Sequence, residues 1–385
     1  MHITLFAAAF AAVASPSAAS ELPGVDALPA VAELPDPFLM AGGRRVATRA
    51  DWAKRRREIR EIVLHYEYGH PPGAPGNVQA EEVPSAEDLN SAATHRRVLL
   101  SCGPRHAVRF ALDVFIPKAG HGPFPVMLTG DGCWGPVEVA EEIVRRGYIL
   151  AQFDRTQLDG DNADRSDGVH PLYPEHDWGT LAAWAWGYSR AVDYLVTRKD
   201  VDARRIAATG HSRGGKTALL ASALDERIAL VAPNGSGCGG AGSYRWLGKG
   251  SEDMAAILKN FPYWFHPRLA EFVGRVNRMP LDQHFLMALV APRPLLSTNA
   301  LGDLWANPEG SQQVYLAAKQ VYQFLGARDF IGIHFREGEH AQNAEDWRAL
   351  LDFADRQFFG KEVARRSDAL AFPALPKAFS WTRPR

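Results

Sequence analysis

The chain has 385 residues, of which 46% are hydrophobic and 23% charged, so it carries enough apolar material for one large core or two modest ones. The 43 Lys and Arg residues nearly balance the 44 Asp and Glu residues, which gives no electrostatic reason to expect nucleic acid or an anionic membrane as a partner. The histidines are scattered without a metal-binding spacing, and we expect neither a metal nor another cofactor.

The first twenty residues, MHITLFAAAFAAVASPSAAS, have the features of a secretory signal peptide cleaved near Ser20. Their apolar run from Leu5 to Ala14 is too short to span a bilayer, and small residues follow it. The alternative is a disordered N-terminus. With the signal, we expect a secreted or periplasmic protein, and no later stretch reaches transmembrane length.

Residues 21–94 are expected to form an N-terminal arm and a helix that pack on the rest of the chain. The arm, to about residue 45, is rich in Pro, Leu and Ala, whereas Trp52 to Tyr68 carries apolar residues at helical spacing. From Arg96 onward, RRVLLSC and VRFALDVFIP are typical of strands, and the alternation in the second indicates an antiparallel hairpin.

Apolar runs of strand length then alternate with helical patterns. The predicted strands are 124–130, 148–154, 205–210 and three more that start near 228, 293 and 330. The predicted helices are 137–147, 178–197, one that starts at Gly214, and 347–359. This order indicates a mostly parallel sheet covered on both faces. An antiparallel pair followed by such strand–helix units is typical of the α/β-hydrolase fold, a three-layer αβα sandwich. We place this catalytic domain at 95–362 and expect a C-terminal tail over 363–385.

The three cysteines, Cys102, Cys133 and Cys238, are an odd number, which argues against a disulfide framework. Each lies beside a glycine or a strand-like run, so we interpret them as small buried residues. One bridge among them stays open at this stage.

The stretch RIAATGHSRGGKTALL (205–220) predicts a nucleophilic serine. Ser212 occupies the centre of a G-x-S-x-G pattern between a strand and a helix, where a nucleophile sits on a sharp turn. Glycines two residues before and after remove Cβ atoms that would collide there. The N–H groups of the following helix point toward developing negative charge. The alternative is a structural turn serine.

In this fold the chain order is serine, acid, histidine, each at the end of a later strand. His340 fits the base because it follows the strand-like IGIHFRE, whereas His334 lies within that strand. His284 lies on a predicted helix, where it is a structural or substrate-facing residue. For the acid, Asp303 follows the strand PLLSTNA, and Glu309 is an alternative with a longer reach.

An oxyanion hole needs N–H donors aimed at the forming oxyanion. One predicted donor is the backbone N–H of Arg213, whose guanidinium is a further candidate. The second is expected from the loop Thr129-Gly130-Asp131-Gly132-Cys133 after an earlier strand.

Ser212-Arg213-Gly214-Gly215-Lys216 resembles the S-R-x-G-K signature of the glucuronoyl esterases, carbohydrate esterase family 15. The likeness covers roughly residues 95–360. It continues through APNGSGCGGAGSYRW (232–246), NFPYWF (260–265), DQHFLMALVAPRPLL (282–296) and GDLWANPEG (302–310). In that family a secreted α/β-hydrolase cleaves the ester between glucuronic acid on xylan and alcohols of lignin.

The resemblance implies a role for each matching residue. It makes Ser212 the nucleophile, His340 the base and Arg213 the oxyanion-hole arginine. Lys216 matches a lysine that contacts uronate hydroxyls, and Trp305 matches a tryptophan that lines the sugar site. These side chains suit a sugar ester, because Lys and Arg donate hydrogen bonds and an indole offers an apolar face.

The sequence also departs from the family pattern. Many members place the catalytic Glu where this chain has Gly235, which favours Asp303 as the acid. Fungal members have a Cys where His211 stands, bridged to a second Cys at the position of Ala341, so both cysteines are missing together. The family's other uronate contacts, a Gln and a Glu, find no match between Trp246 and Phe265.

These features together predict a secreted, monomeric serine carboxylesterase that cleaves a carbohydrate ester. The resemblance implies 4-O-methyl-glucuronoyl esters that link glucuronoxylan to lignin alcohols. One alternative is an acetyl-xylan or other carbohydrate deacetylase on the same scaffold. The other is a carbohydrate-binding pseudoenzyme, against which the complete order of serine, acid and histidine argues.

Overall fold

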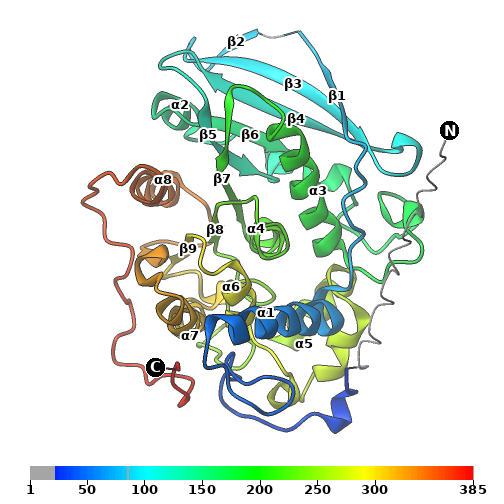
Figure 1. The fold of residues 1–385 in the computed structure, drawn as a ribbon, viewed down its shortest axis with the longest axis vertical. Helices are drawn as coiled ribbons and strands as arrows, with labels where there is room; N and C mark the ends of the chain where they lie inside the picture. Colours follow the sequence, from blue (N-terminus) through cyan, green and yellow to red (C-terminus); the bar gives the residue numbers. More distant parts are fainter. Residues whose placement is uncertain (1–21, 85, 385) are drawn as a thin grey trace, which may run out of the picture.

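A ten-stranded sheet runs through the protein in the order β1-β3-β4-β6-β5-β7-β8-β9-β10, with β2 paired to β3 (Figure 1). The computed structural model describes residues 22–84 and 86–384, so the predicted signal peptide lies outside the described residues. The strands are β1 Gln79–Glu82, β2 Ala86–Asp88, β3 Ala93–Cys102, β4 Val108–Pro117, β5 Phe124–Thr129, β6 Ile149–Phe153, β7 Val201–His211, β8 Leu230–Asn234, β9 Leu295–Ala300 and β10 Ile331–Arg336.

The sheet is parallel from β6 to β10 and antiparallel from β1 to β4. Strand β4 joins the two parts by pairing antiparallel with β6. The predicted hairpin is confirmed, because β3 and β4 pair over their whole length. The segment expected to be only an arm and a helix also contributes β1 and β2, whose exposed polar residues carry no strand-like alternation.

Helices cover both faces of the sheet, as the α/β-hydrolase fold requires (Figure 1). They are α1 Arg49–Val63, α2 Ala140–Arg145, α3 Thr180–Leu195, α4 Arg213–Leu224, α5 Met254–Asn260, α6 His284–Val290, α7 Pro308–Phe324 and α8 Ala344–Phe359. The larger core lies under α1, α3, α4, α6 and α7, and the smaller one under α2 and α8. The helix predicted over 137–147 is shorter, and the one predicted over 52–68 is α1 followed by a π-helical turn, Leu64–Tyr68.

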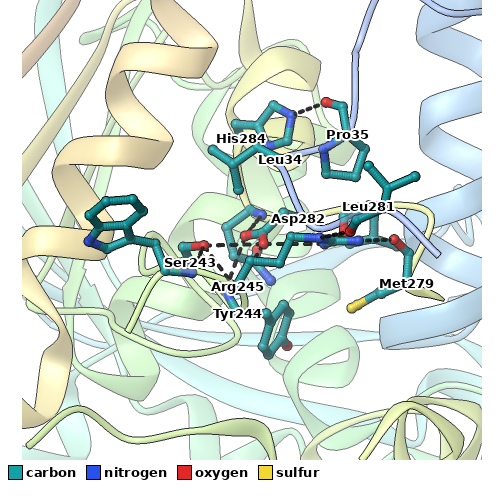
Figure 2. Close-up of polar contacts among 12 residues, drawn as sticks. Leu34, Pro35, Ser243, Tyr244, Arg245, Met279, Leu281, Asp282 and His284 are labelled. Atoms are coloured by element: carbon teal, nitrogen blue, oxygen red, sulfur yellow. Dashed lines mark hydrogen bonds and ion pairs between the residues drawn. The ribbon is translucent and has the colours of Figure 1, made fainter. Parts of the chain in front are cut away.

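The N-terminal arm is fixed to the start of α6 through His284 (Figure 2). The Nε2–H of this fully buried histidine donates to the carbonyl oxygen of Pro35 at 2.8 Å. Burial lowers the pKa of His284 to about 4, so the ring is neutral. His284 therefore has a structural role.

The loop after β8 is anchored on the buried carboxylate of Asp282 (Figure 2). The hydroxyl of Ser243 donates to Asp282 Oδ2, and the backbone N–H of Tyr244 donates to Oδ1, both at 3.1 Å. The Arg245 guanidinium donates to the carbonyl oxygen of Leu281 at 2.7 Å. These contacts fix the loop that follows β8, and β8 is the sheet neighbour of β7, the strand that leads to Ser212.

The three cysteines are free thiols, Cys102 and Cys238 buried and Cys133 partly buried. Every helix in the described part of the chain is too short or too polar to cross a membrane.

Candidate active site

Ser212 lies on a tight turn between β7 and α4, with φ 55° and ψ −120°. Residues with a side chain rarely adopt this conformation, and nucleophile elbows store such strain. A Cβ at Gly210 would lie 2.5 Å from the carbonyl oxygen of Gly214, and a Cβ at Gly214 would lie 2.0 Å from Asp131 Oδ1. Both glycines are therefore required by close contacts, as the G-x-S-x-G pattern predicts.

His340 and Asp303 form a hydrogen-bonded pair. The Nδ1–H of His340 donates to Asp303 Oδ2 at 2.6 Å, and Asp303 Oδ1 accepts from the backbone N–H of Ala306 at 3.2 Å. Asp303 is buried, whereas the His340 side chain is 42% exposed. Because a carboxylate only accepts, the pair holds the His340 proton on Nδ1 and leaves Nε2 free to take a proton.

The two residues considered as alternatives point elsewhere. Glu309 lies in the first turn of α7, and its carboxyl carbon would be 3.2 Å from a Cβ at Gly248. His334 lies inside β10, with its Nε2 3.5 Å from Glu345 Oε1. Of the two predicted acids, Asp303 is therefore the one in contact with His340.

His211 packs against His340, with ring centroids 4.3 Å apart. Its Nδ1–H donates to Asn234 Oδ1 at 2.6 Å, an assignment fixed by the Asn234 amide, which donates to Thr298 Oγ1. Burial lowers the pKa of His211 to about 4, and repulsion from the neighbouring His340 ring when that ring carries a proton acts in the same direction. His211 is therefore neutral near pH 7 and supports the His340 ring by packing.

Gly235 occupies the position at which the family resemblance expects a catalytic Glu. A Cβ there would lie 3.3 Å from Asp303 Oδ2 and 3.4 Å from His211 Cε1, and its φ is +46°. A side chain at this position would press on both neighbours. Asp303 and His211 thus lie where a Glu side chain at position 235 would have to pass.

The Arg213 side chain is held beside the turn by a charge and two rings. Its guanidinium forms an ion pair with Asp161 and lies 5.0 Å and 4.8 Å from the ring centroids of Phe261 and Trp264. The Trp264 indole N–H also donates to Asp161, at 2.8 Å. The cation is therefore fixed one residue after Ser212, at the N-terminus of α4.

Two N–H groups of the loop expected to supply the second oxyanion donor are used within the fold. The N–H of Gly130 donates to the Tyr188 hydroxyl at 2.7 Å, and that of Asp131 donates to Thr129 Oγ1 at 3.2 Å. The Asp131 carboxylate instead accepts from the backbone N–H of His211 at 2.7 Å. This loop thus fixes the elbow, and neither of these N–H groups is free for a substrate.

Lys216 and Trp305 share a neighbour, Glu252, that sequence reasoning missed. The buried Lys216 ammonium donates to the carbonyl oxygen of Ser236. Burial raises the pKa of Glu252, against the opposing effects of the Lys216 charge and a hydrogen bond from Trp305. Trp305 is 50% exposed. Together they form a polar cluster with an open indole.

No local motif marks Glu252, which lies between Trp246 and Phe265, where the resemblance left a Glu unplaced. Its position depends on a long-range backbone contact, because its N–H donates to the carbonyl oxygen of Trp305 at 3.0 Å.

Comparisons with known proteins identify the family to which this chain is similar. Residues 103–326 match the family model of fungal glucuronyl esterases. The chain is 31% identical to carbohydrate esterase MZ0003 of an unknown prokaryotic organism, over 85% of this chain and 90% of that one. It is 31% identical to a 4-O-methyl-glucuronoyl methylesterase of Neurospora crassa, over 89% and 88%. A carbohydrate esterase family 15 glucuronoyl esterase from Caldicellulosiruptor kristjansonii superimposes with a TM-score of 0.79 at 31% identity, over 93% and 99%.

Proposed function

Because the chain belongs to the glucuronoyl esterase family, carbohydrate esterase family 15, we propose that it is a serine esterase that cleaves 4-O-methyl-glucuronoyl esters. The observation that carries this proposal is the Asp303–His340 pair, 2.6 Å between Oδ2 and Nδ1, beside the strained turn of Ser212. The natural substrates are esters that join glucuronoxylan to lignin alcohols, and the enzyme acts as an exported monomer.

In the first half of the reaction, Ser212 Oγ attacks the ester carbonyl while His340 Nε2 takes the hydroxyl proton. Asp303 keeps the imidazole in its productive tautomer and stabilises the imidazolium. The backbone N–H of Arg213 and its guanidinium stabilise the oxyanion. The bond to the alcohol oxygen then breaks, His340 returns the proton to that oxygen, and an acyl-enzyme remains.

In the second half, a water molecule gives a proton to His340 and attacks the acyl carbon. The bond to Ser212 Oγ breaks and Oγ regains the proton, which releases the uronic acid.

The cluster of Lys216, Glu252 and Trp305 supports a sugar as the acyl half. Lys216 offers donors and Glu252 offers acceptors to ring hydroxyls, and the exposed indole offers an apolar face to a pyranose. An acetyl group would use none of these side chains. Together with the similarity to 4-O-methyl-glucuronoyl methylesterases, the cluster favours a uronate ester over the acetyl-xylan alternative.

Substrate profiling of the wild type and Ser212→Ala in parallel tests the proposal. We expect the wild type to hydrolyse benzyl glucuronate and methyl glucuronate, and Ser212→Ala to hydrolyse neither. Hydrolysis of p-nitrophenyl acetate alone would reject the uronate substrate. Failure of a fluorophosphonate probe to label Ser212, together with binding of xylan oligosaccharides, would show a pseudoenzyme.

A further inference from the structure

Trp134 presents an exposed indole at the edge of the candidate active site. It ends the short helical turn Gly132–Trp134 after β5, and 51% of its surface is exposed. Its ring centroid lies 5.8 Å from that of His211, the residue before Ser212. No step of the reaction above uses this ring. A large apolar ring so close to a nucleophile offers a binding surface for part of the substrate.

The indole is held in place from one side by a buried cation. The Arg155 guanidinium lies 4.5 Å from the Trp134 ring centroid and 5.0 Å from that of Trp184. Arg155 is 1% exposed and paired with Asp131, whose carboxylate also accepts from the His211 backbone. One side of the Trp134 indole therefore packs on Arg155, which is linked through Asp131 to the turn of Ser212, and the rest of the indole is exposed to solvent. Stacking on such a fixed ring costs little ordering entropy.

Trp134 and the cluster of Lys216, Glu252 and Trp305 lie on opposite sides of Ser212, as the order of the strands indicates. Ser212 follows β7, whose two neighbours in the sheet are β5 and β8. Trp134 follows β5 on one side of β7, and Trp305 follows β9, which lies beyond β8 on the other side. The two halves of an ester extend in opposite directions from the carbonyl carbon. If the uronate lies over Lys216 and Trp305, the alcohol half extends toward Trp134.

The proton that His340 returns to the leaving alcohol also places the alcohol half of the ester on the side of Trp134. The alcohol leaves beside His340, because this residue returns the proton to it. His340 contacts His211, and His211 contacts Trp134, with centroid separations of 4.3 Å and 5.8 Å. An alcohol oxygen next to His340 therefore brings a ring attached one carbon away toward the exposed indole.

We propose that Trp134 forms the subsite for the alcohol half of the ester and selects aromatic, benzylic alcohols by ring stacking. This inference rests on the proposed esterase function and adds the leaving-group specificity to it.

Four esters test the subsite: the benzyl and methyl esters of glucuronic acid and of acetic acid. We expect Trp134→Ala to lower the benzyl-to-methyl ratio of kcat/KM about 5- to 10-fold, the size of one aromatic pair. Trp134→Phe keeps most of the ratio. The matched control is Trp305→Ala on the sugar side, which lowers kcat/KM for both glucuronates by the same factor and leaves their ratio unchanged.

The outcomes separate the two proposals. An unchanged benzyl-to-methyl ratio in Trp134→Ala overturns the subsite. If the wild type cleaves acetates only, the proposed uronate specificity is lost, and the ratio for the two acetates decides the subsite by itself. If it cleaves none of the four esters, both proposals fall. Should Trp134→Ala misfold, Trp134→Leu covers Arg155 without a π face and answers the same question.

Discussion

At the scale of single residues, the hydrogen bond between Asp303 and His340 determines which imidazole nitrogen is free. Asp303 uses both oxygens, one toward His340 and one toward the backbone of Ala306. An amide in its place would offer either an oxygen or an NH2 group to His340. In the second case the imidazole proton would move to Nε2, and His340 could no longer accept the proton of Ser212.

Asp303→Asn should therefore lower kcat for methyl glucuronate by about 10⁴-fold, as loss of a triad aspartate does in serine proteases. The matched control is Glu309→Gln, which should keep kcat close to that of the wild type because Glu309 faces Gly248. Steady-state kinetics on both variants check the assignment. The opposite pattern would identify Glu309 as the acid.

Lys216→Met tests the sugar-binding cluster, because it keeps the unbranched chain up to the ε position and removes the charged ammonium group. We expect kcat/KM for methyl glucuronate to fall about 10- to 100-fold, the value of one or two hydrogen bonds to a charged group. Hydrolysis of p-nitrophenyl acetate should fall much less, since acetate has no hydroxyls to bind. Equal losses on both substrates would mean that Lys216 supports the fold rather than the sugar.

At the scale of elements, the π-helical turn at the end of α1 buries a carboxyl group. Glu67 Oε1 accepts from the Tyr244 hydroxyl at 2.7 Å and from the Gln283 amide at 2.6 Å. Its Oε2 has no partner within the described residues. Burial raises the pKa of Glu67 to about 7. The folded protein therefore holds a proton that the unfolded chain releases at lower pH.

The free energy of unfolding should consequently fall as the pH rises from 4.5 to 7, by about 3 kcal/mol from this group. Glu67→Gln removes the titration, so its stability relative to the wild type should increase between pH 5 and pH 8. Urea unfolding at several pH values measures the difference. Glu61→Gln, an exposed position on the same helix, is the control. Parallel pH dependences for wild type and Glu67→Gln would contradict the assignment.

The elements that the sequence predicts are those whose apolar pattern follows burial. The parallel strands are buried on both faces and appear as continuous apolar runs. The apolar pattern does not predict helix α7, because this helix buries Gln312 and Gln313, whose amides bind the C-terminal tail. Buried polar residues with a distant partner interrupt the periodicity on which prediction depends.

The residues of the candidate active site also divide into those that a local sequence pattern predicts and those that only tertiary contacts place. The fold prescribes the order and the strand ends at which Ser212, Asp303 and His340 appear, and the structure brings Asp303 and His340 into contact. Glu252 and Asp161 lie outside regular strands and helices, and their neighbours are distant in sequence. Tertiary contacts alone place these two residues, so no local pattern could predict them.

At the scale of the whole molecule, the C-terminal tail runs past α8 and α7 (Figure 1). Gln312 exchanges two hydrogen bonds with the backbone of Phe372, at 2.8 Å and 2.9 Å. Farther along, the Trp381 indole N–H donates to the carbonyl oxygen of Leu34 in the arm at 2.7 Å. The tail and the arm thus meet over the helices that carry one side of the core.

This contact between the tail and the arm, the seam around Trp381 and Leu34, lies at the end of α7 that is far from the candidate active site. Phe38 of the arm contacts both Trp381 and Phe324, the last residue of α7. Asp303 lies just before the first turn of the same helix, and 17 helical residues span about 25 Å. A change at the seam should therefore alter stability without altering catalysis.

Trp381→Ala should lower the free energy of unfolding by about 2 kcal/mol, because it removes a partly buried ring that stacks on Phe379 at 4.3 Å. The exposed Leu370 of the same tail is the control, and Leu370→Ala should change stability by less than about 0.5 kcal/mol. The shift of the urea midpoint measures both. We expect kcat/KM for methyl glucuronate to stay within about twofold of the wild type, since Trp381 lies at the end of α7 that is far from Asp303. A large loss of activity with unchanged stability would show instead that the tail acts on the catalytic residues through α7.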